Sequence, residues 1–268
     1  METVYKQITE QIKAYFKASG FQKTVIALSG GIDSAVVVAL AVEALGKDNV
    51  VVLLLPSQFS SGHSVDDSVD MANRLGIEQY TIPIAPIFQA AVSALEPVFG
   101  NTESGLAEEN MQSRTRMLLT MAVANKRGAL MLNTSNKSEI MVGYGTLYGD
   151  TSGAMGVIAD LYKIEVYALA RYINEVQGDT IPENIITKAP SAELRPDQFD
   201  TDSLPDYDVL DRVLFRLVDL QMTQNQIIEE GFDPEIVARI THLNKNSMFK
   251  RAQLPPAIKL NTDHELCK

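Results

Sequence analysis

The sequence predicts an α/β fold: an open parallel sheet with helices on both faces and a helical C-terminal extension. Three observations support this prediction. Strand-like runs alternate with helix-like runs along most of the chain, which is the pattern of right-handed β-α-β units. Residues 50–55 (VVVLLL) are consecutive branched aliphatics, typical of a parallel strand buried on both faces. Residues 29–34 (SGGIDS) form a glycine-rich turn between a predicted strand and a predicted helix.

The predicted elements follow one another in chain order. Val4, Ile8, Ile12 and Phe16 share one face of a first helix, which Gly20 ends. Strands are then predicted over Lys23–Leu28, Val50–Leu55, Tyr80–Ile84 and Ala129–Leu132. Helices are predicted over Ser34–Leu45, Ser64–Leu75, Ser104–Lys126 and Asp160–Val176.

The C-terminal third has a different character. Ala192–Asp211 is acidic and interrupted by prolines, so we expect a long mobile loop, either a solvated linker or a functional lid. Helical spacing resumes after it: Thr223 and Gln226 form a capping box, and Asp233-Pro234 begins another helix. Neither an internal repeat nor a separate second core is evident, and we therefore expect residues 1–268 to form a single domain.

Composition narrows the class of protein. In 268 residues, 46% are hydrophobic, which is enough for a large core. The net charge of -11 argues against nonspecific nucleic-acid binding, because that binding depends on basic patches. The single cysteine, Cys267, fits a reducing compartment. No apolar run approaches the ~18 residues of a membrane span, and the N-terminus does not resemble a signal peptide. We therefore expect a soluble, cytoplasmic protein that binds neither nucleic acid nor a membrane.

The turn at residues 29–34 has the chemistry of an anion site. Gly30 and Gly31 let the backbone approach a ligand closely, and the N–H groups at the start of a helix attract negative charge. The loop lacks the lysine of the G-x-x-x-x-G-K-[ST] phosphate loop. Asp33 would repel a phosphate unless a cation lies between them, so its presence predicts Mg²⁺. The alternative is a tight turn in which Asp33 is an ordinary helix cap.

The motif S-G-G-x-D-S after a first strand resembles the pyrophosphate loop of the N-type ATP pyrophosphatases, which have an adenine nucleotide alpha hydrolase-like fold. Its members transfer AMP to a substrate and release pyrophosphate. Four further stretches resemble one branch, the NAD synthetases: ENMQSRTRM (109–117), NTSNKSEIMVGYGTLYGD (133–150), KAPSAELRPDQFDTDSLPDYDVLD (188–211) and FKRAQLPP (249–256). In detail, the chain is most similar to the synthetase domain of glutamine-dependent NAD synthetases.

The resemblance implies a ligase reaction. Nicotinic acid adenine dinucleotide (deamido-NAD) would be amidated to NAD through an adenylated carboxylate, with ATP cleaved to AMP and pyrophosphate and with Mg²⁺ as cofactor. No stretch resembles a glutaminase nucleophile, so we expect the nitrogen to come from free ammonia or from a glutaminase domain or partner. The resemblance also implies a homodimer. The long helix over 104–126 is our candidate for its contact, although that helix could equally lie in the core.

The resemblance implies the site residues as well. The residues expected to bind ATP are Ala27, Leu28, Ser29, Gly30, Gly31, Ile32, Asp33, Ser34, Thr134, Lys163 and Ser191. Those expected to bind deamido-NAD are Arg114, Glu139 and Lys250. Asp33 and Glu139 would hold the metal, and Asp33 and Lys163 would be catalytic. Arg116, two positions beyond Arg114, is predicted to form a surface salt bridge. The loop over 195–211 would close over the activated intermediate and exclude water.

Some positions depart from the ammonia-dependent pattern. Where that pattern has arginine, lysine, aspartate and histidine, this chain has Leu54, Leu147, Ala154 and Phe249. These changes concern how the dinucleotide is held. Two rival functions stay open: another adenylating ATP pyrophosphatase, such as a GMP synthetase-like or tRNA-modifying enzyme, and a noncatalytic ATP-binding module. The joint presence of Asp33, Glu139 and Lys163 speaks against the module.

Overall fold

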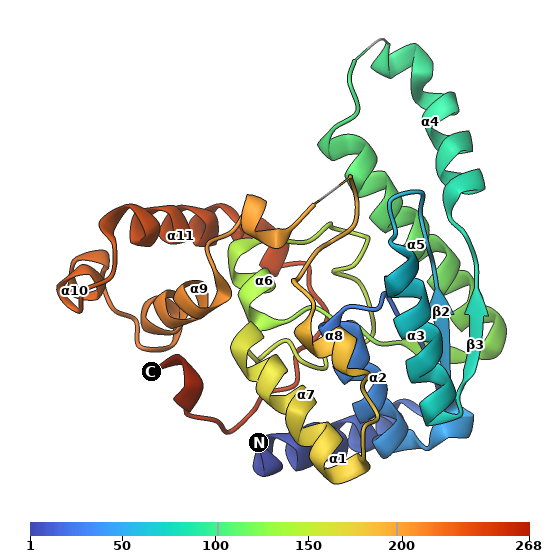
Figure 1. The fold of residues 1–268 in the computed structure, drawn as a ribbon, viewed down its shortest axis with the longest axis horizontal. Coiled ribbons are helices and arrows are strands. Elements are labelled where there is room, and N and C mark those ends of the chain that lie inside the picture. Colours follow the sequence, from blue (N-terminus) through green and yellow to red (C-terminus); the bar gives the residue numbers. More distant parts are fainter. Residues whose placement is uncertain (101, 197) are drawn as a thin grey trace.

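A parallel four-stranded sheet forms the centre of the computed structural model, which describes residues 1–268 except 101 and 197. The strand order is β3-β2-β1-β4. The strands are β1 (Lys23–Ala27), β2 (Val50–Leu54), β3 (Glu78–Thr81) and β4 (Ala129–Met131). In the register, Val25 of β1 lies beside Val51 of β2 and beside Met131 of β4. Helices cover both faces of this sheet (Figure 1).

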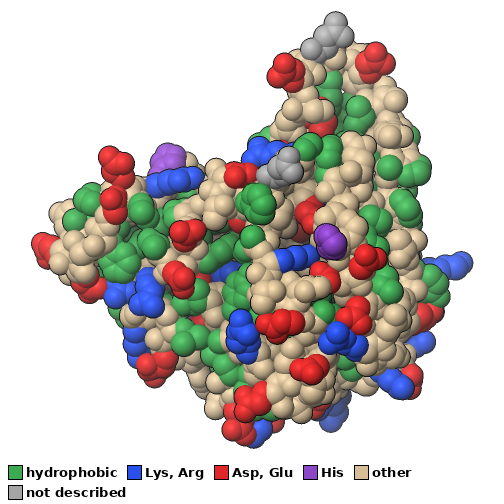
Figure 2. Space-filling model, viewed as in Figure 1, with side chains coloured by type: hydrophobic (Ala, Val, Ile, Leu, Met, Phe, Trp, Pro, Cys, Tyr) green, Lys and Arg blue, Asp and Glu red, His purple; other side chains and the backbone are tan. Residues whose placement is uncertain are grey.

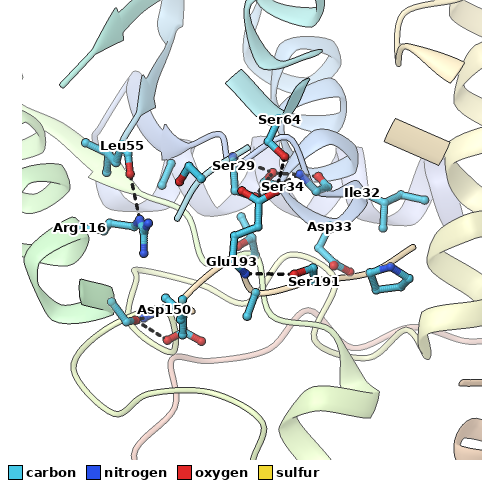
Figure 3. Close-up of a pocket in the computed structure, with 18 of the residues that line it drawn as sticks. Ser29, Ile32, Asp33, Ser34, Leu55, Ser64, Arg116, Asp150, Ser191 and Glu193 are labelled. Atoms are coloured by element: carbon cyan, nitrogen blue, oxygen red, sulfur yellow. Dashed lines mark hydrogen bonds between the residues drawn. The ribbon is translucent and has the colours of Figure 1, made fainter. Parts of the chain in front are cut away.

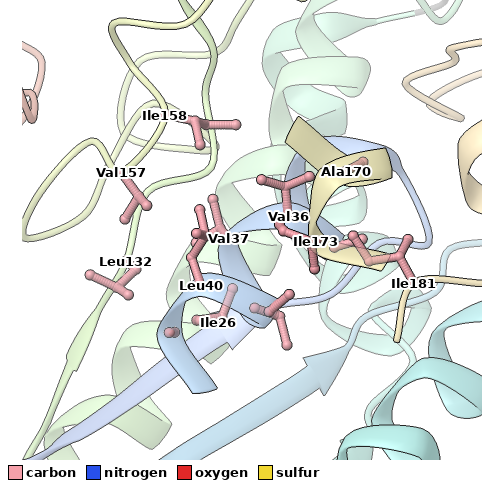
Figure 4. Packing of buried hydrophobic residues seen from close by; sticks show 14 of the residues in the cluster. Ile26, Val36, Val37, Leu40, Leu132, Val157, Ile158, Ala170, Ile173 and Ile181 are labelled. Carbon is pink, nitrogen blue, oxygen red and sulfur yellow. The ribbon is translucent and has the colours of Figure 1, made fainter. Parts of the chain in front are cut away.

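Alternating side chains supply a core to each face of the sheet. Ile26, Val52 and Leu54 belong to the cluster under α1 (Glu2–Ser19), α2 (Ile32–Leu45) and α7 (Lys163–Gln177), part of which Figure 4 shows. Val25, Val51 and Leu53 pack on the opposite side, against α5 (Leu106–Arg127). Burial on both faces explains the unbroken aliphatic run of β2.

The remaining helices of the sheet region are α3 (Gly62–Leu75), α4 (Ala85–Phe99), α6 (Lys137–Val142), α8 (Glu183–Thr187) and the short η1 (Lys47–Asn49). The helix α4 was not predicted from the sequence. It is apolar but buries none of its described residues, and with the start of α5 it projects from the body of the protein (Figure 1).

The C-terminal helices surround a second buried cluster that includes Leu210, Val213 and Ile240. They are α9 (Tyr207–Leu214), the π-helical η3 (Phe215–Asp219), α10 (Gln224–Glu229), α11 (Pro234–Asn246) and α12 (Met248–Arg251). The cluster also contains Val142 and Tyr162, so it continues into the sheet region. The Thr223–Gln226 capping box and the Asp233 cap are confirmed. The tail ends in η4 (Glu265–Cys267), where the Cys267 side chain is buried.

The prediction of a loop over the whole of 192–211 is wrong. A short helix, η2, covers Asp200–Asp202, and α9 begins at Tyr207. Asp200 is buried because the hydroxyls of Tyr144 and Tyr207 donate to its carboxylate at 3.1 and 2.9 Å. Residue 197, inside the predicted lid, lies outside the described residues. In the part of the chain that the structure describes, no helix is long and apolar enough to cross a membrane.

Candidate active site

A cavity of about 1080 Å³ opens at the carboxyl ends of the strands, where parallel sheets bind ligands. Its walls are the turns that follow β1, β2 and β4, one face of α5, and the segments 184–195 and 198–200. Figure 3 shows part of this wall, with Ser29 to Ser34 on one side and Arg116 on the other.

The turn at residues 29–34 has the expected form. Gly30 has φ +77°, and a Cβ there would lie 2.4 Å from the carbonyl oxygen of Ser64. Glycine is therefore required both by the dihedral angle and by the approach of α3. The Ser34 hydroxyl accepts from the Ser29 amide at 3.2 Å and donates to the Gly31 carbonyl at 3.0 Å. These bonds hold the turn over the first residues of α2, where an anion is favoured.

A cluster of charges lies next to the turn. The Lys163 ammonium is 2.5 Å from an Asp33 oxygen and 3.5 Å from a Glu139 oxygen. Asn136 donates to the other Asp33 oxygen at 2.9 Å. Lys163 also lies over the ring of Tyr207, 5.1 Å from its centroid. The chain thereby brings together residues that are far apart in sequence, from the first turns of α2, α6 and α7.

Burial and crowding of negative charge shift the titration of this cluster. Burial, together with the charge of Asp33, raises the pKa of Glu139 to about 8, although Lys163 opposes the shift. Burial alone would lower the pKa of Lys163, but Asp33 and Glu139 raise it above its ordinary value. The ammonium therefore stays charged, and the crowding of negative charge around Glu139 favours an added cation.

The residues present fit a magnesium ion held partly by substrate. Asp33 and Glu139 both face Lys163, and magnesium in nucleotide sites usually takes one or two carboxylates together with phosphate oxygens and water. Among the described residues, no group of three or more acidic, histidine or cysteine side chains could hold a metal by itself. The remaining positions of a magnesium shell here would therefore be filled by water or by oxygen atoms of a ligand.

We predict that Glu139→Gln stabilises the magnesium-free protein at alkaline pH. The folded state binds the Glu139 proton more tightly than the unfolded state, whose pKa is near the ordinary 4.5, so stability is lost as the pH rises from there to about 8. Because the side chain is 17% exposed, we expect a gain on the order of 1 kcal/mol, or about 2–4 °C in Tm, at pH 8.5. Thermal melts from pH 5 to 8.5 measure it. A difference in Tm that does not narrow toward pH 5 would contradict the assignment.

A segment that we call the strap, residues 187–195, crosses the cavity and is fixed on both sides. Glu193 accepts hydrogen bonds from the hydroxyls of Ser61 and Ser64 at 2.9 and 2.6 Å, at the start of α3. On the other side, Gln112 of α5 donates to the Leu194 carbonyl at 2.8 Å. Glu193 has φ +49°, an uncommon conformation for a residue with a side chain, which these contacts maintain. Figure 3 shows its side chain in the middle of the cavity.

Most of the predicted site residues line this cavity: Ala27, Leu28, Ser29, Gly31, Ile32, Asp33, Ser34, Thr134, Glu139, Lys163, Ser191 and Lys250. Asn136, and not Thr134, is the residue that caps α6. Lys250 donates to the carbonyls of Gly143 and Gly145 at 2.8 and 2.7 Å. The amine of Lys250 therefore holds the glycine-rich loop that forms one wall of the cavity.

The two arginines of α5 occupy different surroundings, and only the prediction for Arg116 is contradicted. Arg114 is exposed and does not line the cavity; its Nε donates to the Leu147 carbonyl at 3.1 Å. Arg116 was predicted to form a surface salt bridge, and this is wrong. Its side chain is half-buried, lines the cavity and donates from Nε to the Leu55 carbonyl at 2.9 Å. The helical spacing of Asn110, Ser113 and Arg116 could have identified the inward arginine, but only once the inner face of α5 was known.

The fold and the site together define an α/β protein whose cavity combines a lysine-free, glycine-rich turn, a carboxylate pair and one buried lysine. Comparison with known proteins identifies the family. The model of the NAD synthase family matches residues 4–254, and the chain belongs to this family. The fold predicted from the sequence is confirmed as well.

The similarity extends to curated and solved relatives. The chain is 49% identical over 259 residues to a glutamine-dependent NAD(+) synthetase of Synechocystis, covering 97% of this chain but 46% of that protein. The glutamine-dependent NAD+ synthetase of Acinetobacter baumannii, solved with ADP, is 37% identical with a TM-score of 0.68, over 97% of this chain and 47% of that one. The NH3-dependent NAD synthetase of Campylobacter jejuni is 29% identical with a TM-score of 0.76, over 95% and 96%. The chain spans about half the length of its curated relatives.

Proposed function

We propose that this chain is the ATP-dependent synthetase unit, over 1–268, that converts deamido-NAD to NAD and releases AMP and pyrophosphate. The observation that carries the proposal is the Asp33–Lys163–Glu139 cluster, placed directly beside the turn at residues 29–34. A module that only bound ATP would not require a buried lysine between two carboxylates. The lone, buried Cys267 supports a reducing location such as the cytoplasm.

The reaction needs an activated carboxylate, because oxide is a poor leaving group. The substrate carboxylate attacks the α-phosphorus of ATP, the bond to the β-phosphate oxygen breaks, and pyrophosphate leaves. Ammonia then attacks the carbonyl carbon, loses a proton, and AMP departs. The N–H groups of the turn would bind the leaving pyrophosphate, and the Lys163 charge would stabilise it. Mg²⁺, when bound by Asp33 and Glu139, would neutralise phosphate charge. The walls of the cavity hold both nucleotides in place.

A direct assay measures pyrophosphate release from ATP with deamido-NAD and ammonium, with NAD formation followed in parallel. We expect equal amounts of AMP and NAD. If ATP binds but deamido-NAD does not provoke its cleavage, this function is wrong. Xanthosine monophosphate as the test acid then distinguishes a GMP synthetase-like enzyme, and the absence of cleavage with every acid leaves a binding module.

The same assay can identify the nitrogen donor. We propose that the chain uses free ammonia, or ammonia released by a glutaminase domain or partner. The named relatives at similar length include an NH3-dependent enzyme, whereas the longer curated relatives are glutamine-dependent. We expect ammonium to support turnover of the isolated chain and glutamine not to. Turnover with glutamine alone would contradict this assignment.

We also propose a homodimer formed through α4 and α5. Several large apolar side chains of these helices are exposed: Ile87, Val98, Leu106 and Leu118. Figure 2 shows hydrophobic side chains over the projection that these helices form. The inner face of α5 packs on the sheet, and on this proposal its outer face would form the dimer contact. Exposure of these apolar side chains to water is unfavourable, and a second copy of the chain packed on them would bury them.

Leu118→Glu is expected to convert the dimer to a monomer, because it places a charge in the apolar contact. Leu118 is 59% exposed, and Leu220, in the C-terminal helices, is 53% exposed. Leu220→Glu is therefore a matched control that should leave the assembly unchanged. Sedimentation velocity at micromolar concentrations measures both. A monomeric unsubstituted chain, or a dimer that survives Leu118→Glu, would count against this surface.

We propose that the strap is the lid of the active site and that the hydrogen bonds of Glu193 hold it in place. Its contacts with Ser61 and Ser64 bring it across the cavity, where it would protect the adenylate from water. We predict that trypsin cleaves after Lys188 several-fold faster in Glu193→Gln than in the unsubstituted chain, since the neutral side chain fastens less strongly. ATP with deamido-NAD should slow this cleavage. Equal cleavage of the unsubstituted chain and of Glu193→Gln, each with and without the two nucleotides, would refute closure by this segment.

A further inference from the structure

One face of α5 lines the cavity at intervals of three or four residues, through Asn110, Ser113, Arg116 and Thr120. This spacing is that of a single helical face. Arg114 lies off that face and is exposed. The geometry of α5 therefore directs Arg116 into the cavity, although the two arginines are only two positions apart.

Arg116 is tethered at only one of its nitrogen atoms. Nε donates to the Leu55 carbonyl, directly after β2, and the terminal amino groups point away from Leu55 (Figure 3). Within the described ranges 1–100, 102–196 and 198–268, these terminal groups make no hydrogen bond or ion pair to protein. Burial lowers the pKa of Arg116, although the negative charges of Asp150 and Glu193 oppose this shift. A partly desolvated guanidinium with unused donors favours an anionic ligand.

The other basic lysine and arginine side chains of the cavity wall are already engaged. Lys163 pairs with Asp33, and Lys188 donates to Ser64. Arg195 pairs with Asp202, and Lys250 donates to two backbone carbonyls. The neighbouring position in β2 is Leu54, which is apolar and buried. Among the described residues, Arg116 is the basic group of the wall whose terminal nitrogen atoms have no protein partner.

We propose that Arg116 binds a phosphate oxygen of a nucleotide substrate at the β2 side of the cavity. Arg116 and Asp33 lie on either side of Glu193 in Figure 3, so this subsite is distinct from the carboxylate pair. A guanidinium suits the role because it presents parallel N–H donors to a phosphate and keeps its charge. The phosphate belongs to ATP or to the dinucleotide, and this part of the inference rests on the proposed function.

Calorimetry with magnesium tests the subsite, using a nonhydrolysable ATP analogue in one series and deamido-NAD in another. Arg116→Gln keeps an N–H donor for Leu55 and removes the charge. We expect it to weaken the binding of one of the two nucleotides by roughly 10- to 100-fold, and Arg116→Lys to recover part of that loss. Arg127→Gln is the matched control: Arg127 ends the same helix and pairs with Glu78 on the surface, so both affinities should be unchanged.

Each outcome has a definite meaning. A loss confined to the ATP analogue assigns the phosphate to ATP, and a loss confined to deamido-NAD assigns it to the dinucleotide. Two affinities within about twofold of the unsubstituted chain, in a variant with normal thermal melting, would overturn the proposal. If Arg116→Gln does not fold, unchanged binding by Arg116→Lys has the same force, because an ammonium cannot offer paired donors. Binding without NAD formation in the unsubstituted chain would instead refute the enzyme function alone.

Discussion

Asp33→Asn is expected to reduce deamido-NAD-dependent pyrophosphate release by at least 10²- to 10³-fold. The substitution preserves the size of the side chain but removes the charge that faces Lys163 and, on our proposal, the magnesium ion. Its hydrogen bond from Asn136 needs only an oxygen acceptor, so the amide can keep it. The fold should therefore survive, while phosphate charge in the site is no longer neutralised.

The control for this loss is Asp48→Asn, an exposed aspartate in the short helix before β2. It should leave turnover unchanged. A titration with MgCl₂ adds a second readout, because a weakened metal site needs more magnesium to reach its remaining activity. Turnover of Asp33→Asn within a few-fold of the unsubstituted chain would remove the basis for the metal role of the carboxylate pair.

Gly30→Ala is expected to lower affinity for ATP by roughly 10²-fold, because displacing a positioning group by about 1 Å has effects of this size. The added methyl group would lie 2.4 Å from the Ser64 carbonyl oxygen, and backbone cannot move aside as a flexible side chain can. The turn must then separate from α3 or change its dihedral angles. Either response moves the N–H groups that would bind the phosphates.

Gly20→Ala is a control that carries the energetic cost of a positive φ without a steric clash of the added methyl group. Gly20 has φ +76°, close to the +77° of Gly30, but a Cβ there would meet nothing within 4 Å. It should cost about 1–2 kcal/mol of unfolding free energy and leave ATP affinity unchanged. Calorimetry with ATP and thermal melts measure both quantities. If Gly30→Ala behaves like Gly20→Ala in both, the contact with α3 does not position the turn.

Much of the sheet and its glycine-rich turn could be predicted because the signals are local. The aliphatic run of β2, the helix-ending Gly20, and the Ser29–Ser34 turn each depend on neighbours within a few residues. Two elements could not be predicted in this way. The helix α4 is mostly apolar but buries none of its described residues, so its local sequence does not reveal what its apolar side chains contact. An acidic residue such as Asp200 predicts an exposed loop. Its burial depends on a hydrogen bond from Tyr144, which is distant in the sequence.

The sequence by itself therefore determined the fold class, the glycine-rich turn and the family to which the chain belongs, since motifs and periodicity are properties of short segments. Only the tertiary structure decided which residues face the ligand. It placed Lys163 between Asp33 and Glu139, directed Arg116 into the cavity while Arg114 stays exposed, and brought Glu193 into the cavity. The physical reason is that contacts between distant segments, and the side of a helix that packs on the sheet, depend on the whole chain.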